Sequence, residues 1–351
     1  MEKADIKSMT IEELETFVTE VLGEKKFRAS QLYEWMHVRL AGSFDEMTNL
    51  SKALREKLHQ NAYLAVLTQA RCLVSSIVGT RKYLFRLSDG NVIESVLMKY
   101  KFGNSVCISS QVGCRMGCRF CASTLDGLAR NLTASEMLDE VYSIQRDIGE
   151  RISNVVIMGS GEPLDNYDQV LRFLKLISDE KGLHISQRNL TMSTCGLVPE
   201  IMALAKEQLQ ITLAISLHAV NDERRRELMP IARRYTIAQI LDACRYYYEQ
   251  TKRRITFEYS LARGVNDSSE DARALARLLK GLNCHINLIP INPVKERDFE
   301  QSDPVSVQNF KNKLEKYGGN VTIRREMGRD IQAARGQLRK SYTDNLLGKE
   351  V

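Results

Sequence analysis

The sequence predicts an α/β protein: a partial (βα)6 barrel preceded by a helical domain and a short β-meander. Strand and helix patterns alternate from about residue 104 onward, whereas the first 65 residues carry helical patterns and a hairpin signal follows them. Repeated βα units with apolar strands favour a parallel sheet, and six units fall short of a full eight-unit barrel. The expected stretches are 1–65 (helical), 66–100 (meander), 101–340 (barrel) and 341–351 (tail).

The helical stretch has a clear start signal. Thr10 and Glu13 form a capping-box pattern, which opens a helix that we expect to end before Gly23. Further helical patterns cover 29–40 and 50–59. Basic and aromatic residues near the start of the second helix admit two interpretations, an RNA-contacting surface or a helix face with its solvated rim.

The meander is predicted from two β-type runs, 83–87 and 92–97, that flank an Asp-Gly turn. Glu94 falls inside the second, apolar run. The residues alone leave two readings open: an outward-facing strand residue, or a buried carboxylate with a function.

Six apolar runs are the strand candidates of the barrel: 105–109, 154–158, 189–193, 211–217, 255–260 and 285–289. Helical stretches separate or follow them at 135–148, 168–179, 199–207, 237–250, 269–280 and 305–316. Because parallel strands end at one edge of the sheet, ligands are expected at their carboxyl ends.

Composition narrows the classes of function. The chain has 351 residues, of which 43% are hydrophobic and 27% charged, and a net charge of +6. No apolar run approaches the ~18–20 residues of a membrane span. The charged first residues do not resemble a secretion signal, so the eight cysteines indicate free or metal-bound thiols in a reducing cytoplasm. The mild positive charge is compatible with a polyanionic partner.

Three of these cysteines, Cys114, Cys118 and Cys121, stand in a CxxxCxxC pattern. Zinc sites normally use a fourth nearby ligand, which does not follow here. Soft thiolates at this spacing favour a [4Fe-4S] cluster whose fourth iron is left open for S-adenosylmethionine (SAM). The alternative is three buried or redox-active cysteines.

Polar residues follow four of the predicted strands. Gly161 and Glu162 follow the second strand, where glycine allows close approach to a ligand and the carboxylate can accept a bond from an ammonium group. Ser193 ends the third strand, and Asn292 follows the last. We expect the Gly161–Glu162 turn to hold the amino group of SAM; Ser193 offers a hydroxyl at a strand end, and Asn292 can bind an adenine edge or a ribose hydroxyl.

The fourth strand ends in Ser216, Leu217 and His218, a polar stretch suited to binding a ribose or a carboxylate. His218 taken alone is equally compatible with a structural role. Basic residues form clusters nearby along the chain. Two interpretations are open: a basic rim that attracts RNA phosphates, or solvated helix ends. These clusters are 224–226, 233–234, 252–254 and 324–325.

Together these motifs resemble one family, the RlmN/Cfr family of radical SAM RNA adenosine methyltransferases. The resemblance runs over nearly the whole chain and is closer to RlmN, which methylates C2 of adenosine, than to Cfr, which methylates C8. The segments that match are 106–114, 114–121, 161–163, 193–196, 216–219, 287–290 and 330–338.

The resemblance implies roles for individual residues. Cys114, Cys118 and Cys121 would bind the cluster, and the strand-end residues above would line the SAM site. Glu94 matches the family's acid–base carboxylate, and Cys107 matches the cysteine that resolves a covalent protein–RNA intermediate. The implied substrates are an adenosine in 23S rRNA and one in tRNA; the implied partner is an electron donor such as flavodoxin or ferredoxin. We expect a cytoplasmic monomer.

The chemistry explains why such a family needs radicals. C2 of adenine is electron-poor and cannot attack the methyl group of SAM. In the family, one SAM methylates a protein cysteine, and a second SAM yields a radical that activates this methyl group for addition to the base. The adenosine must leave its stack to reach the cluster.

One position departs from the family. Where the methyl-carrying cysteine is expected, the chain has Arg335. A guanidinium stays protonated and is no thiolate nucleophile. Three explanations are open: an inactive variant, a homologue that binds RNA without methyl transfer, or another thiol, Cys195 or Cys284, in place of the carrier.

Overall fold

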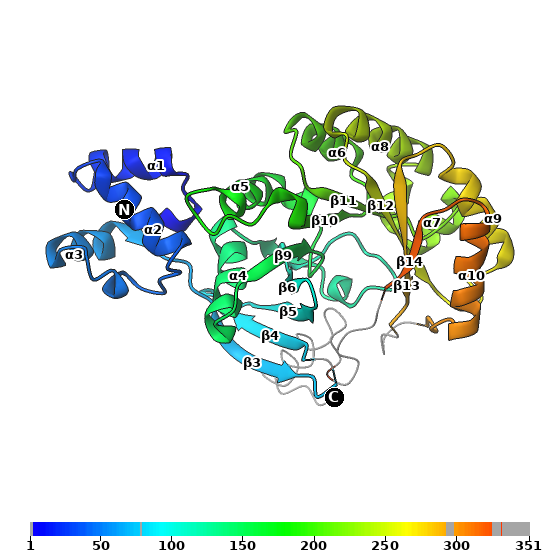
Figure 1. The fold of residues 1–351 in the computed structure, drawn as a ribbon, viewed down its shortest axis with the longest axis horizontal. Coiled ribbons are helices and arrows are strands. Elements are labelled where there is room, and N and C mark those ends of the chain that lie inside the picture. Colours follow the sequence, from blue (N-terminus) through cyan, green and yellow to red (C-terminus); the bar gives the residue numbers. More distant parts are fainter. Residues whose placement is uncertain (1–2, 78, 293–297, 325–330, 332–351) are drawn as a thin grey trace.

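The computed structural model describes residues 3–77, 79–292, 298–324 and 331, and Figure 1 shows their arrangement. A helical unit lies at one end, and the sheet with its covering helices forms the rest. The α/β class and the partial barrel are confirmed. Within the described residues, no helix is long and apolar enough to cross a membrane.

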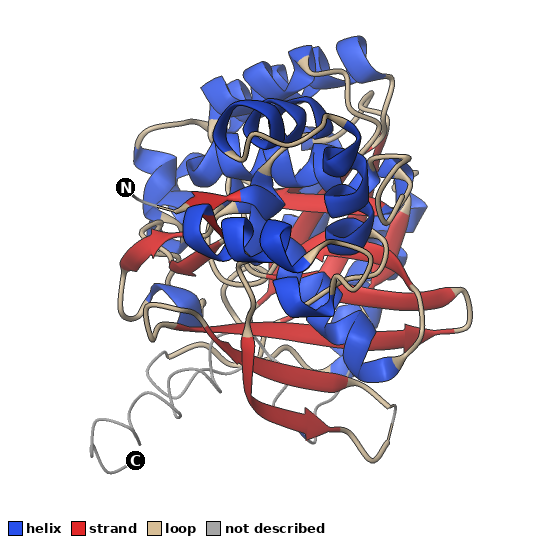
Figure 2. Cartoon of the chain, turned by 90° about the vertical axis from the view of Figure 1, so that its left-hand side faces the viewer, coloured by secondary structure: helices blue, strands red, loops and turns tan. Residues whose placement is uncertain are grey.

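One ten-stranded sheet organises the molecule, in the order β14-β13-β12-β11-β10-β9-β6-β5-β4-β3. The strands from β6 to β14 pair in parallel, and β5, β4 and β3 continue the sheet antiparallel (Figure 2). In the described residues β3 and β14 are unjoined edges, so the barrel is open. The parallel strands are β6 (Gly103–Ile108), β9 (Ile152–Ile157), β10 (Leu190–Thr194), β11 (Thr212–Ser216), β12 (Ile255–Leu261), β13 (Cys284–Pro290) and β14 (Val321–Ile323).

The meander shares the barrel's sheet. Its strands are β3 (Thr68–Val74), β4 (Arg81–Arg86) and β5 (Val92–Tyr100). Residues on β5 alternate between two environments: Ser95 donates to Glu140 of a covering helix, whereas its neighbour Glu94 points to the opposite face. The meander therefore extends the inner face of the barrel beyond β6.

Helices cover the outer face at each predicted position. They are α4 (Ala134–Ile148), α5 (Tyr167–Ser178), α6 (Val198–Lys206), α8 (Ile237–Thr251), α9 (Ser269–Leu278) and α10 (Pro304–Lys316). Capping boxes start α4, α8 and α9, where a Thr or Ser side chain satisfies a backbone N–H that the helix leaves unpaired. Each helix buries one apolar stripe against the strands.

Short elements were absent from the sequence prediction. They include α7 (Asp222–Leu228), the hairpin of β7 (Gln111–Gly113) and β8 (Leu128–Asn131), and the three-residue strand β14. Helix α7 is rich in charged residues and has no apolar stripe to announce it. Elements of three or four residues are too short for a periodic pattern.

The N-terminal unit begins as expected. Thr10 and Glu13 exchange the two bonds of a capping box at α1 (Ile11–Thr16), which continues as a π-helix to Val21. Gly23 then takes a left-handed φ of +62°, which ends the helix. Two more helices follow, α2 (Phe27–His37) and α3 (Lys52–Asn61).

Buried polar contacts fix this unit to the barrel. Lys7 lies 2.9 Å from the Asp139 carboxylate on α4, and both side chains are fully buried. His37 Nδ1 lies 2.9 Å from the Tyr142 hydroxyl, also on α4. Burial, followed by the charge of Lys7, lowers the pKa of His37 to about 3, so the ring is neutral at pH 7. The helical unit is thus docked on α4.

The Lys7→Met substitution tests this docking. It leaves Asp139 buried without its closest cation, and removing one member of a buried ion pair costs about 3–5 kcal/mol. Urea unfolding should therefore show a large loss in the free energy of unfolding. Glu34→Gln is the matched control, because Glu34 and Arg39 form a half-exposed pair worth at most ~1 kcal/mol. Equal losses in the two variants would contradict the docking role.

Candidate active site at the carboxyl edge of the sheet

The CxxxCxxC loop follows the short hairpin strand β7. Gly113 and Gly117 take left-handed φ values of +80° and +72°, which let the chain turn before and between the cysteines. Thr124 donates to the carbonyl oxygens of Cys118 and Cys121 at 3.1 and 2.9 Å. These bonds tie the second half of the loop to the short helix that follows it.

The three thiols interact with one another. Burial raises the pKa of Cys114 to about 12, and Cys121 contributes to this shift. The pKa of Cys118 lies well above its usual value for the same reason, burial first and then Cys121 and Cys114. Because cysteine binds metals as the thiolate, these thiols must lose their protons when a metal binds.

The donor chemistry of the three cysteines suits an iron–sulfur cluster. Thiolates are soft ligands, and in a cubane cluster each thiolate binds a different iron. Among the described residues, no three His, Cys, Asp or Glu side chains are arranged to hold one metal ion. The cysteines therefore fit a cluster through their donor type and their CxxxCxxC spacing.

The glycine–glutamate turn after β9 lies against the segment after β6. Gly161 has a φ of +108°, and a Cβ there would come within 2.8 Å of the Gln111 backbone nitrogen. Glu162 is buried, and its carboxylate accepts bonds from the backbone N–H of Cys195 at 2.7 Å and of Leu164 at 3.1 Å. Burial raises the pKa of Glu162, and these bonds oppose the shift. The carboxylate is thus held in one place.

Polar side chains line the inner face of the next strands. Ser193 of β10 and Ser216 of β11 have their hydroxyl oxygens 3.3 Å apart. Asn287 of β13 donates to Glu258 of β12 at 3.0 Å. Ser216 is the register partner of Glu258, which in turn pairs with Asn287, so these residues form one row. The sequence analysis missed Glu258, although an acidic residue within an apolar strand was the available signal.

His218, Leu217 and Asn292 occupy different environments. His218 accepts a 2.9 Å bond at Nδ1 from the backbone N–H of Ser260, and its ring meets Phe120 of the cysteine loop edge to face. It thus links β12 to that loop. Leu217 is fully buried, whereas Asn292 is exposed at the end of β13.

Glu94 and Cys107 lie together on the inner face. Glu94 is 6% exposed, so the interpretation of Glu94 as an outward-facing strand residue is wrong. Its carboxylate lies 3.3 Å from Lys82 Nζ on β4. Lys82 is a buried cation that the sequence analysis missed, because its place beside Glu94 depends on the register of β4 and β5.

Arg225 corrects the interpretation of the basic clusters. It is fully buried on α7, although a rim or a solvated helix end was expected of residues 224–226. Its guanidinium donates to the carbonyl oxygens of Cys195, Ser216 and Leu217, the backbone at the ends of β10 and β11. It also interacts electrostatically with Cys118. Arg225 is therefore part of the site's framework.

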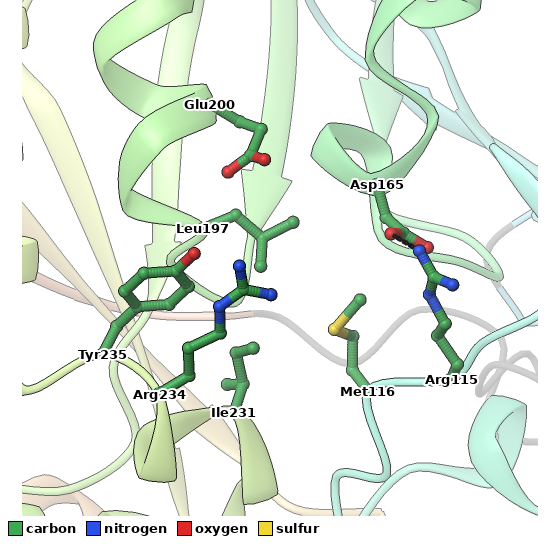
Figure 3. A pocket seen from close by; sticks show the side chains of 8 residues that line it. All are labelled: Arg115, Met116, Asp165, Leu197, Glu200, Ile231, Arg234 and Tyr235. Atoms are coloured by element: carbon green, nitrogen blue, oxygen red, sulfur yellow. Dashed lines mark hydrogen bonds and ion pairs between the residues drawn. The ribbon is translucent and has the colours of Figure 1, made fainter.

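A pocket of about 410 Å³ opens beside the cysteine loop (Figure 3). Arg115 and Met116 come from that loop, and Arg115 pairs with Asp165 at the start of α5. Its lining is Arg115, Met116, Asp165, Leu197, Glu200, Ile231, Arg234 and Tyr235. The pocket thus combines charged and apolar side chains, two of which come from the cysteine loop.

Comparisons with known proteins agree on one family. Residues 108–279 match the radical SAM superfamily, and residues 4–64 match the ribosomal RNA large subunit methyltransferase N-terminal domain. Proteins named "Probable dual-specificity RNA methyltransferase RlmN" are similar over nearly their whole length. That of Lachnospira eligens is 64% identical (97% of each chain), and that of Lachnoclostridium phytofermentans 62% (100% of this chain, 98% of the relative).

A solved structure gives the same result. The crystal structure of a radical SAM methyltransferase from Sphaerobacter thermophilus superposes with a TM-score of 0.91 at 43% identity. The match covers 95% of this chain and 98% of that one.

Replacing Gly113 by alanine tests the geometry of the cysteine loop. The new Cβ would overlap the carbonyl oxygen of Gly127, so the loop must shift. We expect at least about half of the reconstituted iron to be lost, measured as iron per chain, since a rigid backbone contact cannot relax as a flexible side chain can. Gly127→Ala is the control, because Gly127 has a similar φ of +69° but open space around it. Equal iron loss in both would show that strain alone, not the contact, limits the loop.

Proposed function

The chain belongs to the RlmN family of radical SAM proteins, and from this membership we propose that its site is that of an enzyme that methylates C2 of adenosine in RNA. The relatives' name, dual-specificity RNA methyltransferase, supports RNA as the substrate. The observation that carries the proposal is the full-length similarity joined to the three interacting thiols of the CxxxCxxC loop, of which Cys114 is buried.

Radical SAM proteins use SAM and a [4Fe-4S] cluster, which together supply a carbon-centred radical when bound. In this chain, Cys114, Cys118 and Cys121 would hold the cluster, since their thiols interact and stand in the CxxxCxxC spacing. We propose that SAM lies along the strand ends, against Gly161, Glu162, Ser193, Ser216, Leu217, His218 and Asn292. The Leu217 side chain is fully buried, so its part would be played by the backbone.

Glu94 and Cys107 are proposed to act on the RNA. Glu94 would accept the ring proton, because its carboxylate lies at the inner face of the sheet. The Ser109 hydroxyl, just after β6, donates to the backbone carbonyl oxygen of Glu94 and so ties this part of β5 to the end of β6. Once a cysteine stands at position 335, the Cys107 thiolate would attack its sulfur. A disulfide forms, the sulfur–carbon bond breaks, and its electron pair leaves with the base, whose new carbon then takes up a proton to become the methyl group. Both side chains are shielded from bulk water, which favours proton transfer between fixed groups.

The substrates are proposed to be adenosines of 23S rRNA and tRNA. Dual specificity is what the relatives' name states, and C2 rather than C8 follows from the RlmN membership. An exposed, unstacked base is required to reach the inner face of the barrel. A flavodoxin- or ferredoxin-type donor, a monomeric state and a cytoplasmic location complete the proposal.

Arg335 lies outside the described residues, yet its chemistry bears on the reaction. A guanidinium cannot carry the methyl group as a thiolate does. Cys284 begins β13, at the amino end of the strand and away from the site, so it is a poor substitute. Cys195 lies at the correct edge, but the pKa of its thiol is raised well above the usual value, first by burial and then by the charge of Glu162. Its thiol is therefore a poor nucleophile. We therefore propose that Arg335 blocks methyl transfer and leaves the rest of the site in place.

The second candidate function is RNA binding without turnover, and Arg335 is the observation that favours it. This reading predicts an affinity for RNA that falls with salt. It differs from the first in one respect: restoring a cysteine at position 335 would not restore methyl transfer.

Anaerobic reconstitution of the protein and its Arg335→Cys variant tests the proposal. Each would receive iron, sulfide, reductant, SAM and an rRNA or tRNA fragment, with methyladenosine measured by mass spectrometry. We expect 2-methyladenosine from the variant alone. No product from either protein would refute the methyltransferase function, whereas product from the protein with Arg335 would place the carrier at another residue. A product methylated at C8 would identify Cfr-type specificity.

A further inference from the structure

Lys82 is a buried cation on the inner face of the meander. Its side chain is 0% exposed, and Nζ lies 3.3 Å from the Glu94 carboxylate, which is 7% exposed. Taking an ammonium and a carboxylate out of water is costly, and a well-packed apolar pair is often at least as stable. Stability is therefore a weak explanation for this pair.

The strand register brings a third group to the same place. Lys82 on β4 is paired with Val96 on β5, and Val96 is paired with Cys107 on β6. Directly opposed residues share a face of the sheet, and Glu94 shares it too because it lies two positions before Val96. Lys82 and Cys107 thus lie on the same face of the sheet, two strands apart, and Glu94 lies on the strand between them.

The charges of the three groups are coupled. Burial lowers the pKa of Lys82, while Glu94 and then Cys107 act in the opposite direction. The ammonium therefore interacts with the carboxylate and with the sulfur. A cation near two acidic groups stabilises the anionic form of each.

We propose that Lys82 is a positioning residue of this site, which holds the Glu94 carboxylate in place and stabilises the Cys107 thiolate. The inference rests on the proposed function for its purpose, since a base and a nucleophile are both more effective as anions. The positions of Lys82, Glu94 and Cys107 come from the described residues and do not depend on the proposed function.

Thiol alkylation tests the proposal in the protein as it exists. We would measure the rate at which iodoacetamide modifies Cys107 in the unsubstituted protein and in Lys82→Met and Lys82→Arg. Only the thiolate reacts, so loss of the cation should slow Cys107 about tenfold. Lys82→Arg, which keeps the charge, should retain most of the rate. Fragment-ion mass spectrometry separates Cys107 from Cys114, because both lie on the tryptic peptide 102–115.

Two controls separate this role from a general effect on folding. Cys284, on β13, is the internal reference thiol, and Lys99→Met removes an exposed lysine of the same meander. Slowing at Cys107 alone, and only in Lys82→Met, supports the proposal. An unchanged Cys107 rate, or an equal change at Cys284, overturns it.

A kinetic measurement in the Arg335→Cys background adds a functional readout. Lys82→Met should lower kcat about tenfold or more while the KM for RNA stays within about twofold, because Lys82 is placed to act on groups of the protein. A rise in KM with kcat unchanged would overturn the positioning role. If Arg335→Cys makes no 2-methyladenosine, the proposed function fails, and the alkylation result still decides the role of Lys82.

Discussion

The loops after β6 and β9 bond directly to one another, and the rest of the site depends on this contact. The backbone N–H groups of Ser110 and Gln111 both donate to the Ser160 carbonyl oxygen, at 2.9 and 3.2 Å. The side-chain oxygen of Gln111 accepts a 2.8 Å hydrogen bond from the backbone N–H of Glu162. Any Cβ at Gly159 would come within 2.5 Å of the Ile108 carbonyl oxygen, so glycine is required for this approach. The cysteine loop and the Glu162 turn, 40 residues apart in sequence, are therefore fixed relative to each other.

Buried charge along this edge is held by backbone and by paired side chains, which preorganises the site. Glu162 accepts hydrogen bonds from backbone N–H groups, and Arg225 donates hydrogen bonds to backbone carbonyl oxygens. These bonds hold the strand ends in place and also fix the two side chains. Lys82 and Glu94 satisfy one another, as do Glu258 and Asn287. Groups held this way need little rearrangement when a charged ligand arrives, which is the physical basis of electrostatic preorganisation. The cost is the desolvation of several ions within one region.

The sequence was informative where a pattern is local and less so where it depends on packing. Apolar-rich runs predicted β6 and the strands from β9 to β13, and the capping box of Thr10 and Glu13 located the start of α1. Periodicity could place Glu94 on a face of its strand but could not say which face was inside, since a single strand's alternation has no reference. Arg225 looked like a surface residue because burial of α7 is decided by the strand ends it contacts. Lys82 required the β4–β5–β6 register, which no local pattern supplies.

Arg335 separates two properties that the family ordinarily combines. The thiols, Glu162 and the serine pair all come from the barrel strands and their loops, where the described structure gives each a defined partner or neighbour. The position proposed for the methyl carrier, 335, follows the last strand of the described residues. Because the proposed ligands of the cluster and of SAM lie on other parts of the chain, a substitution at this position is expected to remove a nucleophile without removing a ligand. Binding and activation of SAM are therefore expected to be independent of the residue at 335, and methyl transfer to depend on it.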